Sequence, residues 1–298
     1  MRWQKKKSKL KIVNLLKGAL PGLLVLVTGC ASIPANYLAS SVADGIRNQE
    51  DVATAGAGIP SYLLMIDGLL VKNPRETGLL MAGARLYSTY ASLFVSEPSR
   101  ARVLSDRALE YARRAICVDA PAFCTGEARQ YDRFVEMVAA VRDRDHLAEL
   151  YTYATTWAAW IQIHASRWSS VAELPKVSAL LEAVVELDED YDHGQAHVYL
   201  GVINAQLPPS LGGRPEVGRA HFERAIELSH GRNLIAKVEF ARTYARLMYD
   251  RTLYERLLRE VIAAEPRRNG LTLSNVIAQR RARKLLAEID DYFDDEEE

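Results

Sequence analysis

The sequence predicts an all-α protein in which tetratricopeptide-like helical hairpins stack into a compact solenoid. Apolar residues recur at helical spacing over most of the chain, whereas β-branched runs are too short and too isolated to build a sheet. Residues 199–266 also contain two consecutive helix pairs with the pattern of a helical repeat. The alternative is an irregular bundle in which the same helices are simply buried.

The first of these pairs joins a helix with Gly201 to a helix with Phe222, Ala225 and Ile226. A small residue opposite an aromatic-x-x-Ala-Ile run is the tetratricopeptide pattern. The small residue lets two helix backbones approach, and the bulky side chains fill the groove beside them. Such a hairpin cannot bury both of its faces alone, so neighbouring hairpins must stack.

The second pair joins a helix that contains Ala241 to a helix that contains Leu258, Val261 and Ile262. Its first helix has two apolar stripes, which are Val238, Ala241, Ala245 and Met248 on one side and Phe240, Tyr244 and Leu247 on the other. A helix that is apolar on two sides is covered on two sides. The inner helix of a solenoid repeat is covered in this way.

The N-terminus has the order of a lipoprotein leader. Residues 1–29 hold a basic segment and then the apolar stretch Ala19–Val27, which is too short to span a bilayer comfortably as a permanent helix. The stretch runs into Gly29-Cys30, which resembles the bacterial lipobox, so we expect cleavage before Cys30 and acylation of its thiol. The alternatives are a plain signal peptide with an incidental cysteine, or a signal anchor. Positions 31 and 32 are not Asp, which favours the outer membrane over inner-membrane retention.

Removing the leader leaves an acidic protein. The full chain has 38 basic and 38 acidic residues, and the leader holds seven of the basic ones and no acid, so the mature part carries a net charge of −7. This balance argues against a nucleic-acid binder, which needs a basic face. We expect a tether with a first helix over 30–60, a helical domain over 61–290 and a solvated acidic tail over 291–298.

Helices are predicted in close succession along the domain. The expected segments are Ser40–Arg47, Pro60–Leu70, Arg75–Leu93, Arg100–Cys117, Ala128–Val141, Leu147–His164, Leu174–Leu187 and Gly194–Ala205. The third and fourth segments are predicted to form an earlier hairpin in which Gly83 is the small residue.

Two cysteines remain after Cys30, namely Cys117 and Cys124. Exported proteins are oxidised, so an even pair near one turn predicts a disulfide that pins the end of a helix. The alternative is two buried free thiols.

No motif specifies catalysis. His193 and His197 are four residues apart, but Gly194 stands where a zinc protease needs Glu. The sequence also lacks a G-x-S-x-G elbow, a phosphate loop and a G-x-G-x-x-G fingerprint. We therefore expect no enzyme activity, no metal and no cofactor.

Aromatic residues indicate a ligand cleft instead. Trp157, Trp160 and Trp168 gather around one helix and could form the wall of an apolar groove. Tyr199, Asn204 and Arg242 could supply a polar end, because the planar fork of an arginine suits a carboxylate. The alternatives are that the tryptophans pack in the core and that Arg242 simply faces water.

The ordered set of motifs resembles the T-component family of tetratricopeptide lipoproteins, which accompany tripartite ATP-independent periplasmic (TRAP) transporters. The residues that carry the resemblance are Trp157, Trp160, Ile161, Leu207-Pro208, Leu211-Gly212-Gly213, His221-Phe222, Ala225-Ile226, Leu228-Ser229, Gly231–Leu234, Ala241-Arg242, Tyr244-Ala245, Asp250-Arg251, Leu257-Leu258, Glu260-Val261, Asn275, Ala278 and Leu285–Ala287. The resemblance implies a non-enzymatic, lipid-anchored periplasmic homotrimer with a central pore. It also implies that each protomer has an apolar cleft and docks the transporter's solute-binding protein.

Three functions follow as hypotheses. The first is a transport accessory that holds or hands over an apolar organic acid together with a periplasmic binding protein. The second is a structural scaffold for another cell-envelope complex. The third is an undetected helical enzyme, which a cluster of buried carboxylates or histidines with shifted pKa values would favour.

The leader generates a first testable prediction. Because the thiol of Cys30 is the expected acylation site, Cys30→Ser should yield an uncleaved or soluble precursor. Membrane fractionation after a carbonate wash, with mass measurement of the N-terminus, checks this outcome. A variant that stays in the membrane and is still processed at residue 30 would show that the lipoprotein interpretation is wrong.

Overall fold

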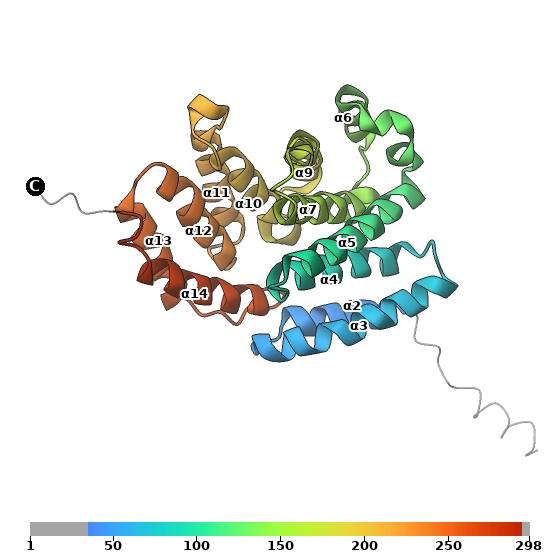
Figure 1. Cartoon of the computed structure of the whole chain (residues 1–298), viewed down its shortest axis with the longest axis horizontal. Helices are drawn as coiled ribbons and strands as arrows, with labels where there is room; N and C mark the ends of the chain where they lie inside the picture. The colour runs from blue at the N-terminus through green and yellow to red at the C-terminus, as the bar shows by residue number, and fades with distance from the viewer. Residues whose placement is uncertain (1–34, 294–298) are drawn as a thin grey trace, which may run out of the picture. The chain divides into compact units, whose positions relative to one another are not determined.

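The computed structural model describes residues 35–293. The chain forms two compact units, residues 1–38 and 39–298, and only the opening residues of helix α2 (Ala35–Arg47) are described in the first. The described part of the second unit consists of helices without a strand, which confirms the predicted all-α class (Figure 1). The predicted leader, Cys30 and the end of the acidic tail, residues 294–298, lie outside the described residues.

The elements of the second unit follow one another with short connections. After α2 they are α3 (Val52–Lys72), α4 (Thr77–Leu93), α5 (Pro98–Asp119), η1 (Pro121–Cys124), η2 (Gly126–Arg129), α6 (Tyr131–Ala140), η3 (Arg144–His146), α7 (Leu147–Ile163), α8 (Trp168–Val171), α9 (Leu174–Asp188), α10 (Tyr191–Ala205), η4 (Pro209–Leu211), α11 (Pro215–Leu228), α12 (Leu234–Phe240), η5 (Ala241–Ala245), α13 (Arg251–Ala263) and α14 (Thr272–Ala287). The predicted helices therefore exist, and most of their ends lie within three residues of the expected positions.

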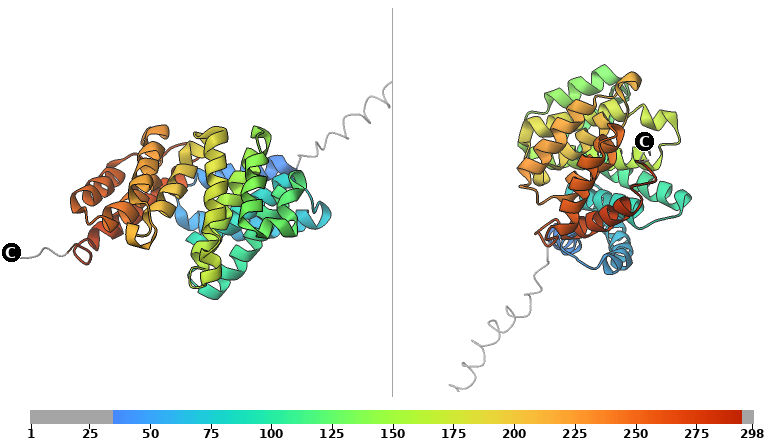
Figure 2. Two further views of the ribbon diagram at one scale, coloured as in Figure 1. Left: turned by 90° about the horizontal axis from the view of Figure 1, so that it is seen from above. Right: turned by 90° about the vertical axis from the view of Figure 1, so that its left-hand side faces the viewer.

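Helices of this unit pack mainly on their neighbours in the chain. The main contacts run from α3 to α4, α4 to α5, α5 to α7, α7 to α9, and then pairwise from α9 to α14. Figure 2 shows the yellow to orange part of this series, α10 to α13, lying side by side. The array also returns on itself, since α14 contacts α3. Asn48 Oδ1 accepts a hydrogen bond of 2.8 Å from the backbone N–H of Gly270, and Arg267 forms an ion pair with Glu50.

The predicted first hairpin is confirmed as α10 against α11. A Cβ atom added to Gly201 would lie 2.7 to 2.9 Å from the ring of Phe222, so only glycine permits this approach. Gly83 plays the same part in the earlier hairpin of α4 and α5, where an added Cβ would lie 2.7 Å from the ring of Tyr111. Small residues thus set the spacing of both hairpins.

The predicted second hairpin is confirmed as α12 and η5 against α13. Val238, Ala241 and Ala245 are fully buried, as a helix covered on two sides requires. The two hairpins share one core, because the ring of Phe222 stacks on that of Phe240 at 5.2 Å between centroids. Met248 departs from the predicted stripe, since it is 46% exposed where the helix has already ended.

Helix α3 begins eight residues before the predicted start at Pro60. A helix that started at Pro60 would have this proline in its first turn, where the missing N–H costs nothing. The structure instead caps the helix at Asp51, whose carboxylate accepts hydrogen bonds of 3.1 Å from the backbone N–H groups of Ala53 and Thr54. Pro60 lies inside the helix.

The start of α10 is unusual. Asp192, His193 and Gly194 have φ values of 50°, 61° and 69°, so three successive residues are left-handed. Regular helix begins after them, close to the predicted start at Gly194. Tyr151 supports the turn by donating a hydrogen bond of 2.5 Å to Asp192.

The close contact at Gly201 generates a second prediction. Gly201→Leu must push α10 away from the ring of Phe222, and overpacking of this kind costs about 1–3 kcal/mol. We expect the melting temperature to fall by several degrees, measured by circular dichroism.

Gly68→Leu is the matched control, because Gly68 is also helical but no atom lies within 4 Å of its added Cβ. The control should keep the wild-type melting temperature or exceed it. Equal melting curves for the two variants would contradict the packing that we describe.

Candidate functional site

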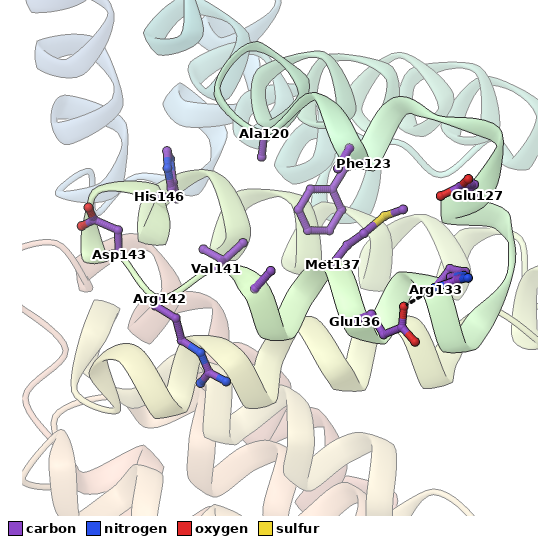
Figure 3. Close-up of a pocket in the computed structure, with 12 residues that line it drawn as sticks. Ala120, Phe123, Glu127, Arg133, Glu136, Met137, Val141, Arg142, Asp143 and His146 are labelled. Carbon is purple, nitrogen blue, oxygen red and sulfur yellow. Dashed lines mark hydrogen bonds and ion pairs between the residues drawn. The ribbon is translucent and has the colours of Figure 1, made fainter.

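A hollow of about 600 Å³ lies beside the C-terminal end of α5 (Figure 3). This volume falls within the usual range for small-molecule sites, about 300–1,000 Å³. The residues that line it are Ala120, Ala122, Phe123, Glu127, Arg133, Glu136, Met137, Ala140, Val141, Arg142, Asp143 and His146. The lining thus combines an apolar floor with a charged rim.

The floor exists because the chain turns sharply after α5. Two short 3₁₀ turns, η1 and η2, lead from α5 into α6, and Phe123 lies in the first of them. Cys117 on α5 and Cys124 on η1 have Cα atoms 5.9 Å apart, and the structure joins their sulfur atoms as a disulfide. The bridge would hold the residue next to Cys124, which is Phe123, against the end of α5.

An aromatic row runs from the hollow into the core. The ring of Phe123 meets that of Phe134 edge to face at 5.6 Å, and Phe134 meets Trp157 in the same way at 5.9 Å. Trp157 in turn stacks on Tyr153 at 5.1 Å. A group that displaces the ring of Phe123 would therefore disturb Trp157 through two ring contacts. The surroundings of this tryptophan can report on the hollow.

One rim cation is placed to meet a carboxylate. Arg133 and Met137 are one turn apart on α6, and both line the hollow. Arg133 donates to Glu136 at 2.7 Å, but both side chains are more than half exposed, so the pair contributes little and can exchange. Arg142 points away from the hollow in Figure 3, and its Nη1 lies 3.9 Å from Glu186.

The predicted tryptophans do not form one wall. Trp157 is buried in the aromatic row. Trp160 stacks on His164 and donates from Nε1 to Asp106 at 2.6 Å. Trp168 is 87% exposed on the short helix α8. Of the three, Trp157 is therefore the one that the aromatic contacts link to the hollow.

The predicted polar residues have partners within the protein. Asn204 is buried, and its Nδ2 donates to the carbonyl of Leu200 at 2.8 Å. Arg242 lies in the π-helical turn η5, where its Nε and Nη2 donate to Glu239 at 2.8 and 2.6 Å. A ligand carboxylate would have to displace Glu239 before it could reach Arg242.

Tyr199 belongs to a polar group near Arg242. Burial, together with the negative charges of Asp192 and Glu239, raises the pKa of Tyr199 to about 12. Arg281 approaches the same Glu239 at 3.5 Å. Tyr199 and Arg242 therefore share a neighbourhood, whereas Trp157 belongs to the aromatic row beside the hollow.

Phe123, Met137 and Val141 are lining residues that the sequence did not single out. They lie in the region between α5 and α7, where elements are short and helical periodicity is interrupted. The available signal was the apolar content of the stretch between Asp119 and Leu147. It could have indicated a partly open core, but it could not have indicated a hollow.

The buried His197 and the half-buried His221 face each other between α10 and α11. The Nδ1 atoms of His197 and His221 are 2.8 Å apart, so one must donate to the lone pair of the other. Burial and the neighbouring imidazole lower the pKa of His221 to about 4, and burial lowers the pKa of His197. Within residues 35–293, no group of three or more His, Cys, Asp or Glu is arranged to hold a metal ion.

Over the described residues, stacked helical hairpins with an apolar, charge-rimmed hollow define a helical-repeat protein. The sequence model of the TRAP transporter T-component family matches residues 48–293, and the chain belongs to this family. Membership associates the chain with a TRAP transport system, in which the T-component is an accessory rather than an enzyme, and with the cell envelope. An uncharacterised protein of Treponema pallidum (strain Nichols) is 24% identical over 264 residues, which cover 82% of this chain and 81% of that protein.

The turn after α5 generates a third prediction. If Cys117 and Cys124 are bonded, protein alkylated before any reduction should carry no label at either position, and a linked peptide should appear by mass spectrometry. The bond closes a short loop, so we expect its loss in Cys124→Ser to cost less than about 3 kcal/mol. Two freely alkylated thiols in periplasmic material would contradict the disulfide.

The histidine pair generates a fourth prediction. The pKa of His221 is lower in the folded than in the unfolded chain. The contribution of His221 to the free energy of unfolding is therefore fully present above about pH 6.5 and is lost as pH falls through about 4. The shift corresponds to roughly 1–3 kcal/mol after allowance for partial exposure. His221→Asn should therefore lose less stability than the wild type between pH 7 and pH 4.5 in urea titrations.

His230→Asn is the matched control, because His230 is exposed and Asn tolerates its left-handed backbone. It should keep the wild-type pH dependence. The histidine pair would be excluded as a source of acid sensitivity if His221→Asn and His230→Asn behaved alike.

Proposed function

We propose that the protein is a lipid-anchored periplasmic accessory of a TRAP transport system that holds an apolar organic acid and docks the solute-binding protein. The observation that carries the ligand half of this proposal is the hollow, in which Phe123, Met137 and Val141 offer an apolar floor beside the guanidinium of Arg133. Membership of the T-component family supports the transport half.

The ligand in this proposal has an apolar body and an acidic head. The body packs on Phe123 and Met137, which keeps its surface from water. The carboxylate accepts hydrogen bonds from Arg133, which releases Glu136 to solvent. Exchange of one exposed carboxylate for another costs little, so the apolar contact would dominate affinity.

The remaining parts of the proposal rest on the sequence and the family resemblance. Cys30 is the proposed acylation site, and the absence of Asp after it favours the outer membrane. The homotrimer and its central pore come from the resemblance alone. The contact of α14 with α3 joins late and early helices of the second unit, which suits a subunit of such an assembly.

A second candidate is a structural envelope scaffold without a small ligand. The pairing of Arg242 with Glu239 and of Asn204 with Leu200 favours it, because these side chains are already engaged. In that case the repeats would serve protein partners only.

The fifth prediction concerns the binding of medium-chain carboxylic acids in the hollow. Intrinsic tryptophan fluorescence measures this binding. The wild type should show a saturable change, because the ring contacts join Trp157 to Phe123. Met137→Lys places a charge on the floor and should weaken apparent affinity about tenfold or more. Arg133→Gln should weaken it less, because only the exposed head group loses a partner.

One control variant and two variants of the alternative site complete the test, with the fold of each verified by circular dichroism. Met248→Lys makes the same exchange at an exposed position outside the hollow and should bind like the wild type. Arg242→Ala and Trp160→Ala test the site expected from the sequence. Loss of binding in these two, with Met137→Lys unaffected, would move the site away from the hollow. No saturable change at millimolar ligand in the wild type would favour the scaffold.

A further inference from the structure

The outer face of α3 differs from an ordinary solvated helix face. Its exposed residues at helical spacing are Ala53, Ala57, Ser61, Leu64, Gly68 and Val71, named here the α3 strip. Leu64 is 73% exposed and Val71 is 82% exposed. The strip carries no charge, although an exposed helix face normally does.

The opposite face of α3 packs against the other helices of the solenoid. Ala55, Ile59, Leu63, Ile66 and Leu70 are buried, and the helix packs on α4. The acidic residue of the helix is also directed inward, since Asp67 accepts hydrogen bonds of 2.7 Å from Tyr87 and from Tyr111.

Comparison with α5 shows how unusual the strip is. The exposed residues of α5 include Asp106, Arg107, Glu110 and Arg113, which are all charged. By length and composition alone, helix α3 is long and apolar enough to cross a membrane. One of its faces, however, is buried against the rest of the protein. The other face lacks the polar surface that a terminal repeat needs in water.

A groove adjoins the strip on the side of α2. It has a volume of about 430 Å³ and lies between the two helices. Val42, Ile46, Ala55, Ile59 and Tyr62 are among the residues that line it. None of the lining residues of this groove carries a formal charge. The strip and the groove together form one uncharged surface.

The length of chain before α2 indicates what covers this surface. Four residues, 31–34, separate Cys30 from the start of α2, and an extended chain spans at most about 3.6 Å per residue. A lipid attached to Cys30 is therefore within about 18 Å of the first residue of α2. Only four residues, 48–51, separate α2 from α3, so an acylated Cys30 would keep this hairpin close to the lipid surface.

We propose that the α3 strip and the adjoining groove rest on the membrane surface, so that the uncharged face contacts the acyl chains at the interface. The inference rests on the proposed acylation of Cys30 and adds an orientation to it. Within the strip and the groove there is no cation of the kind by which most interfacial helices attract anionic lipid, and the exposed Lys72 lies at the end of the helix. Contact should therefore occur with uncharged phosphatidylcholine and be insensitive to salt.

The test uses the acylated mature protein in phosphatidylcholine vesicles whose acyl chains carry bromine, which quenches tryptophan at short range. Leu64→Trp places a reporter on the strip, and Val103→Trp places one on α5 at a comparable exposure of 67%. The native tryptophans contribute the same background to both. We expect the added signal of Leu64→Trp to be quenched at least twofold and that of Val103→Trp to be unchanged, at both low and high salt.

Each other outcome overturns the inference. Equal quenching of the two reporters, in a sample whose acylated N-terminus is verified by mass, overturns the orientation and leaves the anchor standing. An N-terminus without acyl chains overturns the anchor and the orientation together. An unquenched Leu64→Trp, with Leu64→Arg converting an oligomer to a monomer in sedimentation, assigns the surface to a second copy of the chain.

Discussion

The close approach of Gly201 to the ring of Phe222 fixes the part of the fold on which the later helices depend. With a hydrogen atom in place of a side chain, α10 comes near enough to α11 for the ring to fill the groove between them. The same ring stacks on Phe240, which places the next hairpin. From there α13 and α14 follow, and α14 contacts α3. The lack of a side chain at Gly201 therefore affects the positions of many of the helices that follow.

The candidate site arises where this regular order is interrupted. Between α5 and α7 the chain forms 3₁₀ turns and one short helix, and these leave a hollow instead of a packed groove. The aromatic row from Phe123 to Trp157 backs the floor of the hollow, and the Cys117–Cys124 link would hold Phe123 in that floor. Irregular structure on a rigid scaffold is where binding sites commonly occur.

Sequence reasoning succeeded where local periodicity decides the outcome. The spacing of small and aromatic residues predicts the all-α class, the two hairpins and the role of Gly201. The packing of the helices requires the same spacing. It failed at Pro60, because the cap made by Asp51 competes with the preference of proline for a first turn. It also joined Trp157 and Arg242 in one cleft, whereas the structure pairs Arg242 with Glu239 and packs Trp157 against Phe134. Such pairings depend on neighbours that are distant in the chain, and a single sequence does not reveal them.

The central claim is that this helical-repeat protein serves a TRAP transport system. The most direct measurement is sedimentation velocity of the purified lipidated protein in detergent with the TRAP solute-binding protein from the same cell, in the presence of its solute. The account predicts a saturable complex that contains both proteins. Independent sedimentation of the two proteins at concentrations of tens of micromolar, with and without solute, would contradict it.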